Sequence, residues 1–94
     1  MYMNDEELEL PPMWALRRIK KLWAEFKDKE FRFDDATAVL KDDDPRIISS
    51  ALSKLVKLGW ITVRKEVGNP PKAIYKISKP KSVEAILLHV KVED

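Results

Sequence analysis

The 94-residue sequence has no cysteine, one histidine and only two glycines. Without cysteine it has no disulfide, no thiolate metal ligand and no cysteine nucleophile. The single histidine, His89, cannot by itself form a zinc site or a Ser-His-Asp triad. Two isolated glycines do not form a phosphate-binding loop. We therefore predict a protein that is not an enzyme and holds neither a metal nor an organic cofactor.

Long hydrophobic runs are also missing. No apolar stretch approaches the length of a transmembrane span, and the first residues are acidic rather than a basic segment before an apolar core. We expect a cytoplasmic protein that makes no membrane contact. Hydrophobic residues form 45% of the chain, which favours one small folded domain over disorder. Abundant lysine and glutamate without cysteine also fit an archaeal or thermophilic source.

The strongest local signals lie between residues 44 and 59. Asp44 is a good helix N-cap, Pro45 suits the first helical position, and Gly59 supplies the conformation that commonly ends helices. Between them, apolar residues recur every three or four positions: Ile48, Ala51, Leu52, Leu55 and Leu58. This spacing predicts a helix over residues 45–58 with one buried face and one small, polar, positively charged face.

After Gly59 the apolar period changes from helical to alternating. Residues 61–64 and 73–78 read as two strands, joined by a turn over residues 67–72 that contains one glycine and two prolines. We expect four side chains to point inward: Ile61, Val63, Tyr75 and Ile77. The tip and outer face of this hairpin, residues 60–77, should carry Arg64, Lys65, Lys72 and Lys76.

The flanking segments complete one small domain. Residues 13–29 have the apolar stripe of a helix, and residues 30–33 alternate like a short edge strand with Phe31 and Phe33 inward. Asp34 should cap a short helix, and Ser82 a last one. We divide the chain into an acidic flexible arm (1–12), a main domain (13–81) and a C-terminal helix (82–94). That helix is apolar enough to pack on the first helix, to form a homodimer, or both.

The order of these segments is similar to a known family. The run I-S-S-A-L-S-K-L-x-K-x-G-W-I at residues 48–61, followed by a basic hairpin, resembles the winged helix-turn-helix domains of small prokaryotic and archaeal transcription regulators. The resemblance implies an α+β fold with a three-helix core, a β-hairpin wing and here an extra C-terminal helix. It also implies a recognition helix at 45–58 that enters the major groove of DNA.

Charge is segregated along the chain in a way that fits this resemblance. Residues 46–81 contain nine lysines and arginines and one acidic residue, whereas residues 1–13 and 30–44 each carry a net charge of −4. A basic face of this kind is expected to bind the phosphates of double-stranded DNA. The candidate DNA-binding residues are Arg46, Ser49, Ser50, Ser53, Lys54, Lys57, Arg64, Lys65, Lys72 and Lys76.

One stretch favours a different function. Asp42, Asp43 and Asp44 place three carboxylates at the start of the predicted recognition helix, where they would repel phosphate. Acidic residues also stabilise helix N-termini, and one aspartate is enough for capping. Ile47 in the same turn suits a thymine methyl or a protein partner. The alternative to a DNA-binding regulator is therefore a winged-helix module that binds protein within a transcription, replication or other complex.

Overall fold

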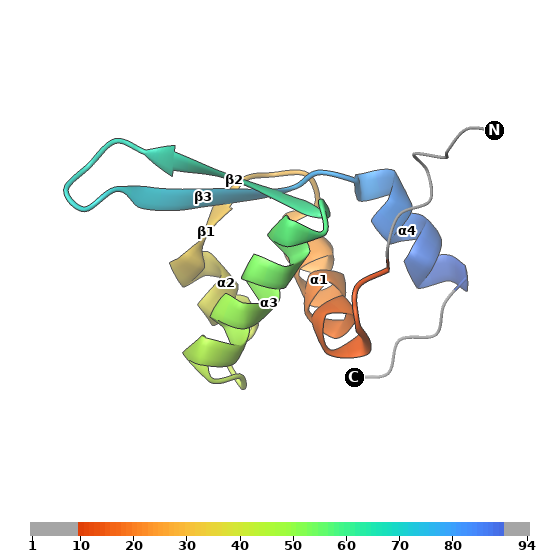
Figure 1. Cartoon of the computed structure of the whole chain (residues 1–94). Coiled ribbons are helices and arrows are strands. Elements are labelled where there is room, and N and C mark those ends of the chain that lie inside the picture. Colours follow the sequence, from red (N-terminus) through yellow and green to blue (C-terminus); the bar gives the residue numbers. More distant parts are fainter. Residues whose placement is uncertain (1–9, 90–94) are drawn as a thin grey trace.

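The computed structural model describes residues 10–89. The elements in chain order are helix α1 (Met13–Phe26), strand β1 (Phe31–Arg32), helix α2 (Phe33–Val39), helix α3 (Pro45–Lys57), strand β2 (Ile61–Glu66), strand β3 (Lys72–Ile77) and helix α4 (Pro80–His89). Helices α1, α2 and α3 lie on one side of the sheet, and the β2–β3 hairpin extends beyond them as a wing (Figure 1). The predicted α+β winged helix-turn-helix fold is confirmed.

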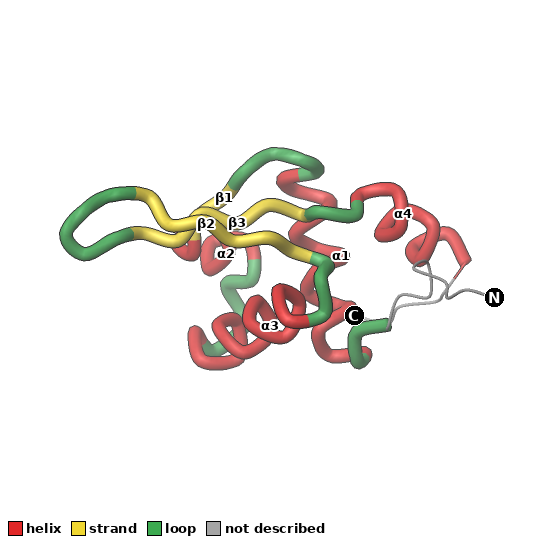
Figure 2. The backbone as a smooth tube through the Cα atoms, turned by 45° about the horizontal axis from the view of Figure 1, so that its top comes forward, coloured by secondary structure: helices red, strands yellow, loops and turns green. Residues whose placement is uncertain are grey.

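The sheet has three antiparallel strands in the order β1-β3-β2. The tube in Figure 2 follows the long hairpin, with β1 beside it near the helices. The predicted edge strand at residues 30–33 is present as the two residues of β1, where Phe31 pairs with Tyr75. Strand β2 forms the opposite edge of the sheet, and its register places Ile61 across from Ile77 and Lys65 across from Ala73.

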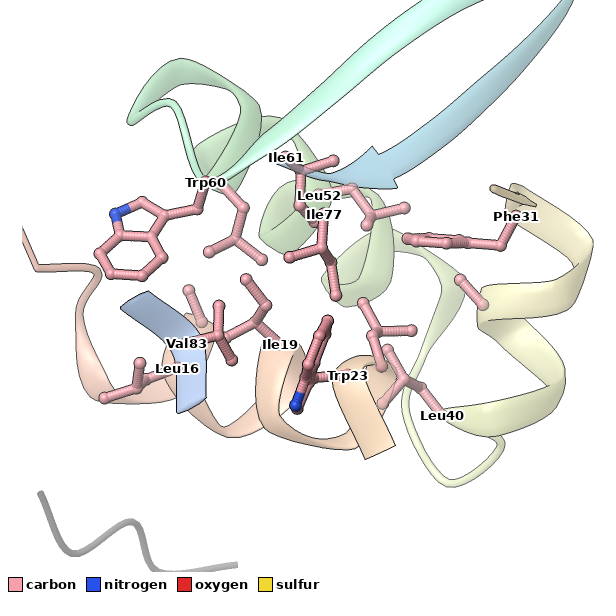
Figure 3. Packing of buried hydrophobic residues seen from close by; sticks show 14 of the residues in the cluster. Leu16, Ile19, Trp23, Phe31, Leu40, Leu52, Trp60, Ile61, Ile77 and Val83 are labelled. Atoms are coloured by element: carbon pink, nitrogen blue, oxygen red, sulfur yellow. The ribbon is translucent and has the colours of Figure 1, made fainter. Parts of the chain in front are cut away.

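The core lies between the inner face of the sheet and the helices. Trp60 and Phe31 lie toward opposite ends of it in Figure 3, with Trp23 of α1 across from the sheet. Helix α3 contributes the face predicted from its spacing, because Ile48, Leu52 and Leu55 are buried together with Ala51. Helix α4 enters the same cluster through Val83. The amphipathic pattern of α3 therefore fixes which of its faces is left for solvent or a partner.

The junction between α3 and β2 is short and held by several hydrogen bonds. Leu58 caps α3, and Gly59 has a φ of +85°, the left-handed conformation predicted for a helix stop. The Trp60 amide donates to the Leu55 carbonyl at 2.9 Å, and the Ser78 amide donates to the Trp60 carbonyl at 3.0 Å. The Ser78 hydroxyl also donates to the Gly59 carbonyl at 2.8 Å. The end of α3 and the base of the wing are thereby joined directly.

Two helix boundaries differ from the sequence prediction for local reasons. Helix α1 ends at Phe26 rather than at residue 29, because Lys27 takes a positive φ of 53°. Helix α2 begins at Phe33, so the prediction that Asp34 is its N-cap is wrong. Arg32 occupies the cap position, and its amide donates to the Asp35 carboxylate at 2.9 Å. Asp35 thus satisfies a free backbone donor at this helix start.

The other two boundaries shift by one or two residues. Helix α3 ends at Lys57, one residue before the predicted end, with Leu58 as its C-cap. Helix α4 starts at Pro80, so Ser82 lies in the first turn instead of capping it, and the predicted boundary between residues 81 and 82 falls inside α4. Of the predicted arm, residues 1–9 lie outside the described part, and Pro11 is buried.

Candidate nucleic-acid interface

The exposed face of α3 is a narrow stripe of short and cationic side chains. Arg46, Ser50, Ser53 and Lys57 follow one another at four- and three-residue steps, opposite the buried residues of the helix, and all four are exposed. The helix contains no acidic residue. Because serine is short, the backbone of α3 can come close to a surface on this side. Such a stripe suits insertion into a groove with negatively charged walls.

The two flanks of α3 differ. Ser49 and Val56, seven residues apart, lie on the flank toward the wing, since Val56 lines the space between the helix and the strands. Ile47 and Lys54, also seven residues apart, therefore lie on the flank away from the wing. Of the predicted DNA-binding residues on α3, Lys54 is partly buried and the other five are exposed.

An open groove of about 310 Å³ separates α3 from the wing. Its walls are formed by Ser53, Val56 and Lys57 of α3 and by Val63, Lys65, Ala73 and Tyr75 of the sheet. It contains two lysines and no carboxylate. Burial raises the pKa of the Tyr75 hydroxyl, which therefore keeps its proton and can donate a hydrogen bond. We call this site the helix–wing groove.

Two residues of the wing can be compared with the sequence prediction at this groove. Val63 points to the inner face as expected, but it is 40% exposed, because the hairpin extends beyond the helices that would cover it. Lys65 was predicted to lie at the tip or on the outer face of the hairpin, and instead it lies on the inner face. Neighbouring residues of a strand point to opposite faces, and Lys65 lines the groove with Val63.

The outer face of the sheet carries two ion pairs that cross strand β3. Arg64 Nη2 lies 2.8 Å from Glu30 Oε1, and Arg32 Nη2 lies 2.6 Å from Glu66 Oε1. Ile74 is paired in register with both arginines, and it is buried although it lies outside the main core cluster. The predicted DNA contact Arg64 is therefore already engaged with a carboxylate.

The Arg64–Glu30 ion pair makes the stability of the fold depend on pH. Hydrogen bonds from the Arg64 guanidinium hold the pKa of Glu30 below its ordinary value. The contribution of this pair to stability is present above the pKa of the unfolded chain, and it is lost as pH falls through the lower folded-state pKa. We expect an NMR titration to show a depressed Glu30 pKa that returns toward its ordinary value in Arg64→Gln. Arg32→Gln, which breaks the other pair, should leave the Glu30 pKa unchanged.

Lys72 and Lys76 lie on this outer face as well. The register places Lys72 opposite Glu66 and Lys76 opposite Thr62, on the same side of the sheet as Arg64. The ten predicted residues therefore divide into two groups. The α3 side holds Arg46, Ser49, Ser50, Ser53, Lys54, Lys57 and Lys65, and the outer face of the wing holds Arg64, Lys72 and Lys76.

Two of the three aspartates before α3 have structural partners. Asp43 accepts two hydrogen bonds from Arg18 of α1, at 3.2 and 2.9 Å, in a pair that is largely shielded from solvent. Asp44 caps α3 by accepting from the Arg46 amide at 2.8 Å, and this bond lowers the Asp44 pKa. Asp42 alone has no polar partner among residues 10–89. The acidic turn thus presents less free charge than its sequence indicates.

Sequence reasoning missed the apolar part of this interface. Val56 and Tyr75 line the helix–wing groove, and Arg18 neutralises Asp43 from a helix far away in the sequence. The alternation of side chains along a strand could have predicted that Lys65 faces the groove. Arg64 and Lys65 are neighbours, so they point to opposite faces of the sheet. Nothing in the spacing of residues indicated that Arg18 would reach Asp43.

We also searched residues 10–89 for a metal site and for a membrane-spanning helix. Within that range no three histidine, cysteine, aspartate or glutamate side chains come together as a candidate metal site. No helix within the same range has the length and apolar character needed to span a membrane.

Comparison with known proteins shows a likeness to a solved structure. No protein-family model matches the chain, and no curated protein matches it either. Among solved structures, the chain is similar to a protein from Porphyromonas gingivalis W83 that is assigned to the MarR family of transcriptional regulators. The TM-score is 0.55 with 12% identity, over 97% of this chain and 100% of the other. At that identity the likeness establishes a shared fold: this chain folds as a winged helix like that of the MarR-family protein.

Proposed function

We propose that this protein is a DNA-binding transcription regulator that presents α3 to the major groove and the helix–wing groove to the sugar-phosphate backbone. The observation that carries the proposal is the pair of exposed lysines, Lys57 and Lys65, which face the same groove without a carboxylate beside them. Cationic side chains in such a position attract phosphates and release condensed counterions. The overall fold and the acid-free surface of α3 support the same function.

The predicted contact residues have different roles in this function. Lys54, Lys57 and Lys65 supply attraction to phosphates that does not depend on base sequence. Arg46 and the exposed serines Ser49, Ser50 and Ser53 face the base edges. Lys72 and Lys76 act mainly through their long-range field, since they lie on the other side of the sheet from the groove. Arg64 keeps Glu30 as its partner.

A titration with duplex DNA of random sequence tests this function without knowledge of a target site. We expect the fluorescence anisotropy of a labelled duplex to rise with added protein at low salt. If Lys54, Lys57 and Lys65 contact phosphate, log affinity should fall with log salt with a slope of roughly −3 for each bound chain. A duplex that remains unbound at low ionic strength would refute the proposal.

The regulator is proposed to act as a homodimer. Leu88 of α4 is 80% exposed, and two large apolar residues at the start of α1, Met13 and Trp14, are exposed as well. A twofold dimer that buries these exposed residues would present two copies of α3 to a pseudopalindromic site. Sedimentation velocity should give a dimer, and Leu88→Glu should shift it toward monomer. A monomer at high protein concentration would contradict this part of the proposal.

The same exposed apolar residues favour the second candidate, a protein-interaction module. Under that function the exposed residues of α1 and α4 would bind a different protein. The two candidates predict different results in the anisotropy titration, because a protein-binding module has no reason to bind DNA with a steep salt dependence.

A further inference from the structure

An exposed isoleucine stands at the start of the proposed recognition helix. Ile47 is 43% exposed, and the other large apolar side chains of α3 are buried or partly buried. Ile48, the next residue, already fills the core at this level of the helix. A large part of the Ile47 side chain is therefore left open to solvent or to a partner at the N-terminal end of α3.

The surroundings of Ile47 limit what it can contact. Arg46 and Ile47 are the two long exposed side chains at the N-terminal end of α3, because the next exposed residues of the helix, Ser49 and Ser50, are short. Helix α3 contains neither asparagine nor glutamine, the side chains that pair most directly with adenine. In the major groove the C5 methyl of thymine is the apolar group that distinguishes one base from the others.

We infer that Ile47 reads a thymine through its C5 methyl group. This inference rests on the proposed function, since it requires α3 to enter the major groove. It makes Ile47 a specificity-determining residue. Arg46 next to it lies 3.4 Å from the Asp44 carboxylate on the exposed surface and would exchange that contact for a guanine. The preferred half-site would therefore contain a thymine close to a guanine, and the serines would add little discrimination.

Deoxyuridine, which lacks only the methyl group, isolates this contact. Duplexes that bind wild-type protein would first be selected from a random library. Each thymine of the selected half-site would then be replaced in turn by deoxyuridine, and affinity measured by competition. We expect one position at which wild type binds deoxyuridine about fourfold more weakly, the value of one buried methyl or methylene group.

Substitutions of Ile47 and Arg46 test which side chain is responsible for the preference for thymine over deoxyuridine. In Ile47→Ala the ratio of affinities for thymine and deoxyuridine at that position should fall to about one, and Ile47→Val should restore part of it. Arg46→Ala should keep the ratio while losing discrimination at another position. The inference is overturned if no thymine is selected, or if Ile47→Ala keeps the wild-type ratio. Absence of any duplex binding would instead overturn the proposed function, and this inference with it.

Discussion

Replacing Lys57 and Lys65 together by glutamate should lower the affinity for duplex DNA by roughly a hundredfold at moderate salt. Each substitution removes an attraction to phosphate and adds a repulsion in the same helix–wing groove. Because both side chains are exposed and have no carboxylate partner among residues 10–89, the fold itself should be little affected. Anisotropy titrations of wild type and variant at several salt concentrations measure the change. The salt slope should become shallower by about two units, one for each lost phosphate contact.

The matched control reverses the same amount of charge on the opposite face of the wing. Lys72→Glu with Lys76→Glu changes the net charge identically but leaves the groove intact. We expect a smaller loss of affinity and a salt slope close to that of wild type, since screening weakens charges that do not touch the duplex. Equal losses in the two double variants would mean that net charge, rather than the groove, determines binding.

Trp60→Ala should destabilise the fold by about 3–5 kcal/mol, the usual cost of truncating a buried tryptophan. Trp60 is 1% exposed and lies in the core between the start of β2 and helices α1 and α4 (Figure 3). Small domains have a total stability of about 5–15 kcal/mol, so a large fraction would be lost. Urea denaturation followed by far-UV circular dichroism measures the free energy of unfolding without relying on tryptophan fluorescence.

Trp14→Ala is the control for this substitution. It also removes a tryptophan side chain, but from a position on α1 that is 38% exposed. The decrease in the free energy of unfolding of the monomer should therefore be much smaller. If the protein is a dimer, both variants should be compared at protein concentrations where wild type is fully associated, because association adds to apparent stability. Similar losses for the two variants would contradict the central role of Trp60.

The elements with strong local signals were predictable from the sequence. Asp44, Pro45 and Gly59 determine where α3 begins and ends through capping and backbone conformation, which involve only nearby residues. The buried face of α3 followed from its period, and the wing followed from alternation around a proline-rich turn. Asp34 was wrongly predicted to be the N-cap of α2. Two acidic residues are adjacent there, and it is the Asp35 carboxylate that accepts the hydrogen bond from the Arg32 amide.

The electrostatic character of the candidate site depended on contacts that sequence spacing does not contain. Arg18 reaches Asp43 across 25 positions, and Glu30 reaches Arg64 across 34. The first pair reduces the negative charge before α3, and the second occupies an arginine that had been assigned to DNA. Such pairings arise when the fold brings distant segments together, so charge counts along the chain misjudged both the acidic turn and the outer face of the wing.

The three-residue junction from Leu58 to Trp60 has a consequence for the kinetics of recognition. Its backbone is held at both ends by hydrogen bonds, to α3 on one side and to Ser78 directly after β3 on the other, and these bonds join the end of the helix to the base of the wing. The helix–wing groove then exists before any ligand arrives. Little conformational entropy is lost when a duplex enters a preorganised groove, and association need not wait for a rearrangement of the protein. Differences in affinity among DNA sequences should consequently appear mainly as differences in dissociation rate.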